Sequence, residues 1–295
     1  MDTRVQIALK RYLLRKASTQ AVAEALKRGA MDEPFGATRH KLLRQASRLA
    51  ACSITQHARI TSKPDEGIRL RTSNKRACRH RMCPQESAVN ARAQAEHLEA
   101  VFDEAWRISP GARALFLTLT TKNVPIDQVG KSFRDHDAAV KRFFALKRVQ
   151  DGILGHYTAF EVAIRGTKEA PKAGVHSHSI LLVEPGALSD HRYIRQAEYV
   201  RLWQAAARIS YKPVVDIRAV KSKSGSTDRE AVHDAIRELV KYVVKSAGFF
   251  QHQPGGRIEV SPRVAVALAI GLHRRRVARY DRIFQQAMKA LKRKA

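Results

Sequence analysis

The hydrophobic and polar positions between residues 114 and 250 alternate between two repeats. Runs of apolar and β-branched residues are typical of strands, whereas apolar residues three or four positions apart are typical of helices. The expected order is strand, helix, strand, strand, helix, strand, helix, over residues 114–121, 129–147, 154–164, 175–183, 189–208, 214–220 and 227–247. This order predicts an α+β fold in which an antiparallel sheet is backed by helices.

Local signals sharpen two of these elements. Residues 165–174 are rich in Gly, Lys and Pro, which predicts a long loop joining the two middle strands into an antiparallel hairpin. Thr227 and Glu230 fit a capping box, in which each side chain bonds a backbone amide at the helix start. The last helix is therefore expected to begin at Thr227 and to end at Gly248.

The two ends of the chain look different from this middle part. Residues 2–28 show helical spacing that Gly29 is expected to stop, and residues 38–87 look irregular and basic and hold all three cysteines. A helix is expected over residues 88–106. From Ser261 another helix is expected, followed by a basic stretch that we interpret as a solvated tail or as a contact to the DNA backbone.

The charge of the chain points to a polyanionic partner. Its 295 residues include 55 Lys and Arg against 27 Asp and Glu, a formal net charge of +28, while 44% hydrophobic content is enough for a real core. Such an excess favours nucleic acid as the partner, with acidic substrates and anionic membranes as alternatives. The longest apolar run, residues 264–272, is too short to span a membrane. Three cysteines do not make a disulfide framework, so we expect a reducing, cytoplasmic location.

Two histidines at the start of a predicted strand form a candidate metal site. His176 and His178 project from the same face because strand side chains alternate. Glu161, on the preceding strand of the hairpin, can add a carboxylate oxygen. Two imidazoles and one carboxylate with open positions suit Mg²⁺ or Mn²⁺ beside a phosphate. The alternative is an ordinary set of surface side chains.

A tyrosine on the last predicted helix is a candidate nucleophile. Tyr242 lies one turn after Glu238 and next to Lys241, with Lys245 close behind. A tyrosine hydroxyl can attack phosphorus when a metal polarises the phosphate and a carboxylate activates water. The alternative is a core tyrosine with a solvated hydroxyl.

The cysteines suggest zinc without completing a zinc signature. Cys78 and Cys83 are five positions apart and Cys52 lies upstream, so a fourth ligand is needed. The candidates for that ligand are His57, His80 and Glu86. Buried free thiols are the alternative.

Taken together, four blocks resemble the rolling-circle replication initiator proteins of small bacterial plasmids, members of the HUH endonuclease superfamily. The blocks are residues 78–84 (CRHRMCP), 116–123 (FLTLTTKN), 176–178 (HSH) and 238–245 (ELVKYVVK). They lie within residues 48–250, and the ends of the chain are not covered. The resemblance implies an HUH-type sheet in the βαββαβα order.

The resemblance also implies a reaction: a metal-dependent nick in one strand of an origin. Tyr242 would keep the 5′-phosphate and leave a 3′-hydroxyl that primes replication, and Glu238 would activate water at termination. The motifs of the family then assign roles to residues of this chain. The catalytic residues would be Tyr242, Glu238 and Lys245, and the ligands of Mg²⁺ or Mn²⁺ would be Glu161, His176 and His178. The candidate zinc ligands are Cys52, Cys78 and Cys83, and the candidate DNA-binding residues are Arg79, Arg81, Lys122 and Lys241. The implied partners are a single-stranded or hairpin origin, a host helicase and a polymerase, with no membrane.

The resemblance divides the chain into four parts and shows two departures. The expected parts are a basic N-terminal helix (1–37), a Cys/Arg-rich candidate zinc module and helix (38–110), the HUH endonuclease domain (111–250) and a basic C-terminal helical tail (251–295). The middle residue of the metal motif is usually hydrophobic but is Ser177 here, and Glu86 stands where a third cysteine often closes the cysteine block.

Three other functions compete with this one. A relaxase or transposase of the same superfamily would use similar residues for a different biological role. A non-catalytic, zinc-stabilised DNA-binding repressor would explain the charge and would form no covalent adduct with DNA. An RNA-binding protein would need exposed aromatic residues, and the aromatic content is only 6%.

Overall fold

The computed structural model describes residues 3–54, 56–63, 67–74, 78–220, 228–240 and 249–294. Each of its two compact units is built from two separate stretches of the chain. One unit holds residues 1–90 and 246–270, and the other holds residues 91–245 and 271–295. We refer to them as the helical unit and the sheet unit.

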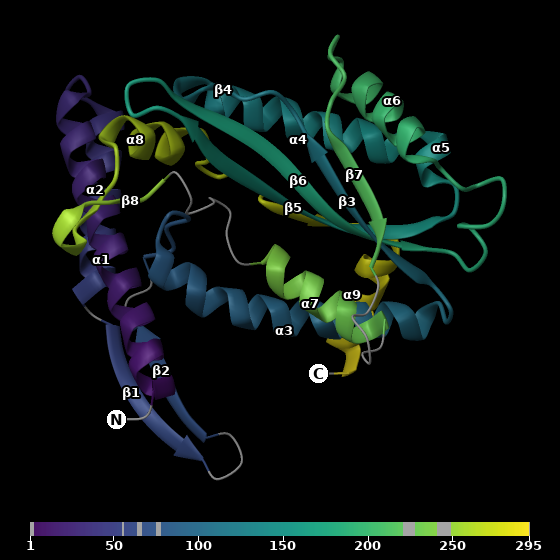
Figure 1. Ribbon diagram of the computed structural model, residues 1–295, viewed down its shortest axis with the longest axis horizontal. Helices are drawn as coiled ribbons and strands as arrows, with labels where there is room; N and C mark the ends of the chain where they lie inside the picture. The colour runs from purple at the N-terminus through teal and green to yellow at the C-terminus, as the bar shows by residue number, and fades with distance from the viewer. Residues whose placement is uncertain are drawn as a thin grey trace. The chain divides into compact units, whose positions relative to one another are not determined.

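A six-stranded antiparallel sheet organises the sheet unit (Figure 1). Its strands are β3 (Arg113–Thr120), β4 (Val124–Pro125), β5 (Ile153–Gly166), β6 (Pro171–Val183), β7 (Val215–Ala219) and β10 (Ala278–Tyr280). The order across the sheet is β10-β5-β6-β3-β7, and β4 also pairs with β6. The predicted α+β class and the βαββαβα order are confirmed.

Helices cover both faces of this sheet (Figure 1). On one side lie α4 (Val129–Ala145) and α6 (Gln196–Ala207), and on the other lie α3 (Pro84–Ile108) from residue 91 on, α7 (Asp228–Leu239) and α9 (Arg282–Lys294). We call these sides the α4 face and the α7 face. Because neighbouring side chains of a strand point to opposite faces, each strand contributes to two separate cores.

Aromatic side chains fill both cores. On the α4 face Phe133 packs on Phe160 with ring centroids 5.3 Å apart, and the Trp203 indole N–H donates to the Thr120 carbonyl at 2.8 Å. On the α7 face Phe102 packs on Phe284 with ring centroids 4.5 Å apart. These contacts fix the amphipathic helices against the sheet through their apolar sides.

The helical unit contains more regular structure than the sequence indicated. It holds helices α1 (Thr3–Asp32), α2 (Ala37–Ile54) and most of α8 (Pro262–Gly271), the hairpin of β1 (Gln56–Lys63) and β2 (Gly67–Asn74), and the small pair β8 (Gln251–His252) and β9 (Ile258–Glu259). The prediction that residues 38–87 are irregular was wrong. Leu42, Ala46 and Leu49 are buried at helical spacing, a pattern that the many basic residues between them obscure.

Gly29 does not stop the first helix, which was a second wrong prediction. Helix α1 continues to Asp32. A Cβ at position 29 would lie 2.6 Å from Val266 Cγ2 and 3.1 Å from the Pro262 carbonyl oxygen. Glycine is therefore needed at this position for close packing between helices and not to end one.

Three other predicted boundaries shift, and those of the last helix lie outside the described residues. The hairpin strands run on to Gly166 and start again at Pro171, so the loop is shorter than expected. Helix α4 ends at Ala145, because Leu146 has an extended backbone, with ψ 127°. Helix α6 begins at Gln196 and not near residue 189. Helix α7 is described from Asp228 to Leu239, and the predicted cap Thr227 and end Gly248 lie outside the described residues.

The basic C-terminal stretch is not a solvated tail. Strand β10 pairs with β5, and Arg279 makes two hydrogen bonds of 2.7 and 2.6 Å to the Asp137 carboxylate on α4. Ile283, Phe284 and Ala287 of α9 are buried in the α7-face core. The solvated-tail alternative was wrong because a three-residue strand carries no pattern of its own and is specified by its partner strand, whereas contact with the DNA backbone stays a prediction. No helix in the described part of the chain is both long and apolar enough to cross a bilayer.

Replacing Phe284 with Ala should lower the free energy of unfolding by about 3–5 kcal/mol, because it removes a fully buried ring and leaves a cavity. Thermal or urea unfolding followed by circular dichroism measures this loss. The exposed Lys289 on the same helix is the matched control, and Lys289→Ala should stay within about 0.5 kcal/mol of the wild type. Equal, small effects of both changes would mean that α9 is not part of the core.

Candidate active site

Glu161, His176 and His178 lie together on the α7 face of the sheet. Antiparallel pairing sets Glu161 of β5 directly opposite His176 of β6, and His178 follows two positions later on the same face. The potential ligand atoms of the three side chains all lie within 4.8 Å of one another. His178 Nε2 is 3.3 Å from a Glu161 carboxylate oxygen. The structure thus brings together the three residues that the sequence grouped.

A threonine from the neighbouring strand orients one of the histidines. Thr118 of β3 pairs with His178 across the sheet, and its hydroxyl lies 3.1 Å from His178 Nδ1. This bond leaves Nε2 directed toward Glu161. Hydrogen bonds of this kind to the second ring nitrogen hold the metal-binding histidines of many proteins in place.

Asn123 and Gly174 also belong to this region, and sequence reasoning gave neither a role. Gly174 lies two positions before His176 on the same face. A Cβ there would lie 2.3 Å from Asn123 Oδ1 and 3.2 Å from His176 Nε2. The missing side chain of Gly174 therefore makes room for the Asn123 amide next to the His176 ring. In the sequence, the one indication of a role for Asn123 was its place as the last residue of the 116–123 block.

The three side chains form a donor set that suits a divalent ion. Two imidazole nitrogens and one carboxylate oxygen leave coordination positions for water or a phosphate oxygen, a combination found with Mg²⁺ and Mn²⁺ and with other first-row metals. Glu161 and His178 are largely shielded, with side chains 16% and 22% exposed. The site is therefore close to solvent but not open on all sides.

Ser177, between the two histidines, points to the α4 face as its position in the strand requires. It is fully buried, and its hydroxyl lies 3.0 Å from His136 Nε2 on α4. Burial, together with the nearby His176 and His178 rings, lowers the pKa of His136 to about 3, so this ring is neutral. A polar residue in the middle of the motif is thus paired with a second polar residue behind the sheet.

The predicted nucleophile cannot be placed relative to this cluster. Tyr242, Lys241 and Lys245 lie outside the described residues. Glu238 is described near the end of α7 and is exposed. Val232 and Ile236 of α7 are buried in the α7-face core, so this helix is fixed on the same face as the histidines.

The three cysteines meet in the helical unit. Cys52, Cys78 and Cys83 are buried, and their sulfur atoms lie within 4.8 Å of one another, with 3.7 Å between Cys52 and Cys83. A hydrogen bond from Cys78 is the largest influence on Cys83 and lowers its pKa to about 6. The same bond and burial raise the pKa of Cys78.

The Glu86 carboxylate contacts one of the three cysteines. Its Oε2 atom accepts hydrogen bonds from Cys78 Sγ at 3.2 Å and from the Arg79 amide at 2.9 Å, and the side chain is buried. His80 is engaged elsewhere, with Nε2 3.0 Å from the Gln45 side chain and Nδ1 3.3 Å from the Met82 amide. The side chain of His57 lies outside the described residues. Of the three candidate fourth ligands, Glu86 is the one that the structure places at the cysteines.

The predicted DNA-binding residues fall in different units. Arg79 and Arg81 belong to the helical unit, and Arg79 is an exposed residue with a left-handed backbone (φ 51°). Lys122 belongs to the sheet unit, where its ammonium lies 4.3 Å from the centre of the Tyr211 ring. Their role in DNA binding remains a prediction.

Comparison with known proteins gives a consistent result. A family model described as "Replication protein" (Rep_1) matches residues 69–295. A relative named "Protein rep" from Lentilactobacillus hilgardii is 31% identical over 230 residues, which cover 77% of this chain and 70% of the relative. One of the same name from Bacillus amyloliquefaciens is 31% identical over 68% of this chain and 60% of the relative. A third protein of this name, from Streptococcus pneumoniae, is 27% identical over 83% of this chain and 71% of the relative. No solved structure matches the chain significantly.

Replacing Ser177 with Ala should lower the free energy of unfolding by about 1–3 kcal/mol, because the buried His136 Nε2 loses its hydrogen-bond partner. The double variant Ser177→Ala/His136→Phe removes both polar groups and should be less destabilised than the sum of the two single changes. Urea unfolding of the four proteins in this double-mutant cycle measures the coupling. Strict additivity would show that the two residues do not stabilise each other.

Proposed function

The chain belongs to the Rep family of replication proteins, and on this basis we propose that it starts rolling-circle replication of a plasmid by nicking one strand of the origin. The single observation that supports the nicking chemistry best is the cluster of Glu161, His176 and His178. A protein that only binds DNA has no need for two imidazoles and a carboxylate gathered beside a solvent-accessible edge.

In this proposal Tyr242 is the nucleophile. Its hydroxyl oxygen forms a bond to the scissile phosphorus, and the bond from phosphorus to the 3′ oxygen breaks. The 3′ oxygen takes up a proton to replace the one that tyrosine loses, so that the DNA ends in a free 3′-hydroxyl. Glu161, His176 and His178 would hold a divalent ion, which when bound would supply Lewis-acid polarisation of the phosphate. The phosphotyrosine conserves the phosphodiester linkage, so a later attack by a 3′-hydroxyl rejoins the strand.

Glu238 and the basic residues have supporting roles. Glu238, four positions before Tyr242 in the sequence and exposed at the end of α7, takes a proton from the water that ends the reaction. Lys245 is assigned to charge stabilisation at the phosphate, and Arg79, Arg81, Lys122 and Lys241 to DNA contacts. The net charge of +28 supports tight, salt-sensitive binding to the origin. A host helicase and polymerase would extend the 3′ end.

We further propose that Cys52, Cys78, Cys83 and Glu86 bind one structural zinc ion. Three thiolates and one carboxylate meet the usual requirement of four ligands for zinc. Such an ion would tie the end of α2 to residues 78–83, which precede α3 and form neither helix nor strand. The alternative of three buried free thiols makes a different prediction for metal content.

Incubation of the purified chain with Mn²⁺ and single-stranded oligonucleotides tiled across its replicon's origin should give an adduct that resists SDS. Tyr242→Phe should abolish the adduct, since the nucleophilic oxygen is lost, and His178→Ala or EDTA should reduce it about 100-fold or more. Glu238→Gln should still form the adduct but release it by hydrolysis about 10²–10⁴-fold more slowly. Electrophoresis of labelled DNA under denaturing conditions gives both readouts.

Two outcomes would count against this function. Tight, salt-sensitive binding with no adduct on any origin strand would favour the DNA-binding repressor. An adduct that persists in Tyr242→Phe would mean that another residue is the nucleophile.

Metal analysis by mass spectrometry should find about one zinc per chain after purification in zinc-containing buffer. Cys83→Ser should lose this zinc, and Glu86→Gln should weaken its retention against a chelator by about tenfold or more. His80→Gln is the matched control in the same loop and should keep zinc. A wild-type chain without zinc, or an equal loss in His80→Gln, would contradict the proposed ligand set.

A further inference from the structure

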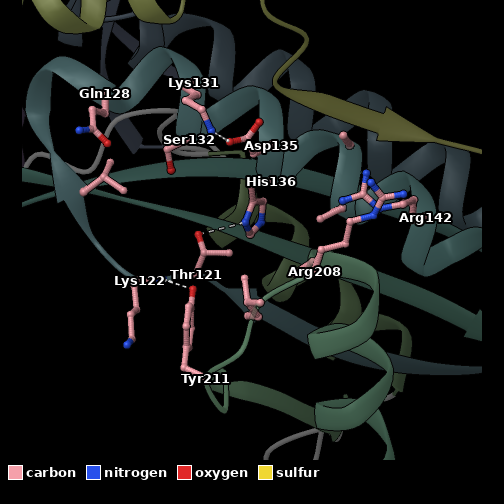
Figure 2. Close-up of a pocket in the computed structure, with 15 residues that line it drawn as sticks. Thr121, Lys122, Gln128, Lys131, Ser132, Asp135, His136, Arg142, Arg208 and Tyr211 are labelled. Atoms are coloured by element: carbon pink, nitrogen blue, oxygen red, sulfur yellow. Dashed lines mark hydrogen bonds and ion pairs between the residues drawn. The ribbon is translucent and has the colours of Figure 1, made fainter.

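A second candidate site lies on the α4 face of the sheet unit. A cavity of about 530 Å³ opens between α4, α6 and the end of β3 (Figure 2). Its volume is within the range typical of small-ligand sites, roughly 300–1,000 Å³. Four cationic side chains line it, from Lys122, Lys131, Arg142 and Arg208. The glutamate and histidine cluster is on the opposite face.

Two arginines come together at one end of this cavity. Arg142 reaches from α4 to the end of α6, where its Nε donates to the Ala206 carbonyl at 2.7 Å. Arg208 follows Ala206 by two positions, and Figure 2 shows both guanidinium groups at the same end of the cavity. Within the described residues no carboxylate lies within ion-pair distance of either guanidinium.

The two lysines of the cavity each have a contact of their own. Lys131 forms an ion pair of 2.6 Å with Asp135, one turn along α4. The Lys122 ammonium lies over the Tyr211 ring, and the Lys122 amide donates to the Tyr211 hydroxyl at 2.8 Å. Lys131 is thus balanced by a carboxylate, whereas Lys122 stacks on an aromatic ring at the exposed end of the lining, and Arg142 and Arg208 supply two further positive charges.

Two neighbouring guanidinium groups without a carboxylate favour an oxyanion ligand. Arginine presents a planar fork of N–H donors that matches phosphate, and bonds of this kind are stronger than those between neutral groups. The cavity is much larger than a phosphate group alone needs. Ala138, Ala139 and Ile209 add apolar wall next to the arginines, which suits the sugar and base of a nucleotide.

The cavity and the candidate active site lie at the same end of the sheet, on its two faces. Thr121 and Lys122 directly follow β3, whose last residue, Thr120, pairs with His176. His136 lines the cavity and makes the hydrogen bond to Ser177, the residue between the two histidines. The two sites thus share the same end of the sheet.

We propose that this cavity binds one nucleotide of the single-stranded DNA near the nick, with Arg142 and Arg208 holding its phosphate. The inference rests on the proposed function, since it takes single-stranded DNA as the ligand. A free nucleotide has the same chemistry and is the other source that the test must separate.

Arg208 allows an unusually clean variant. It adopts a left-handed backbone (φ 56°) just after α6, where glycine is normally preferred, so Arg208→Gly removes the guanidinium without straining the fold. Arg274 is an exposed residue of the same unit with the same backbone conformation (φ 53°) and lies outside the cavity. Arg274→Gly is therefore a control matched in charge and in backbone change.

The experiment measures binding of the full chain to a fluorescently labelled oligothymidylate in EDTA, over a series of salt concentrations. Arg208→Gly should bind about tenfold more weakly than the wild type, the size expected for a lost charge-assisted bond, and its salt slope should fall by roughly one phosphate contact. Arg274→Gly should match the wild type within about twofold. Thermal unfolding should show that neither variant is less stable.

Equal DNA affinity of the two variants would overturn the proposal. A second arm titrates thymidine 5′-monophosphate by calorimetry. If Arg208→Gly lost only binding of the free nucleotide and kept its DNA affinity, the assignment to a DNA strand would be wrong.

The test is independent of nicking, because EDTA prevents the reaction. Weaker binding by Arg208→Gly in a chain that forms no adduct would keep the cavity as a DNA site and reject the endonuclease. An adduct in the wild type together with equal binding by both variants would reject the cavity alone.

Discussion

The register between β5 and β6 is the constraint on which the rest of the sheet unit depends. Both faces of the sheet are covered by helices, so most positions on these two strands face one of two cores. A slip by one residue would turn His176 and His178 toward α4 and Ser177 toward α7. In the native register Glu161 of β5 lies opposite His176 of β6, and this pairing brings Glu161 into one cluster with the two histidines.

Buried polar groups on the α4 face make this register specific. His136 bonds Ser177, and a second chain of bonds runs from His156 to Thr158 at 2.9 Å and from Thr158 to Ser179 at 2.7 Å. In a slipped register the bonds from Ser177 to His136 and from Thr158 to Ser179 would be lost, and each buried polar group left without a partner costs about 1–3 kcal/mol. The polar residues that interrupt the apolar strands are therefore part of what defines the site.

The sequence predicted what depends on local spacing. The alternation of strands and helices, the shared face of His176 and His178, and the pairing of Cys78 with Cys83 all follow from short-range patterns. Long-range contacts were missed: Gly29 continues a helix because of Val266, residues 278–280 become a strand because of β5, and Thr118 orients His178 because β3 lies beside β6. In each case the deciding atom belongs to a distant part of the chain. Tyr242, the main functional prediction, lies outside the described residues and stays a prediction.

The way the chain passes between the units has a consequence for folding. Strand β10 and helix α9 are the last elements of the sheet unit to be synthesised. Between them, the Asp281 carboxylate accepts a hydrogen bond from the His156 amide at 2.9 Å, although the two residues are 125 positions apart in the sequence. Residues 246–270 of the helical unit lie between these partners. Closing so long a loop costs conformational entropy before the contacts at its ends can stabilise the fold. Chains dominated by contacts between distant residues therefore fold slowly. During synthesis the open edge of β5 would therefore be exposed until residues 278–280 leave the ribosome, and that interval is when the sheet is most prone to pair with another chain.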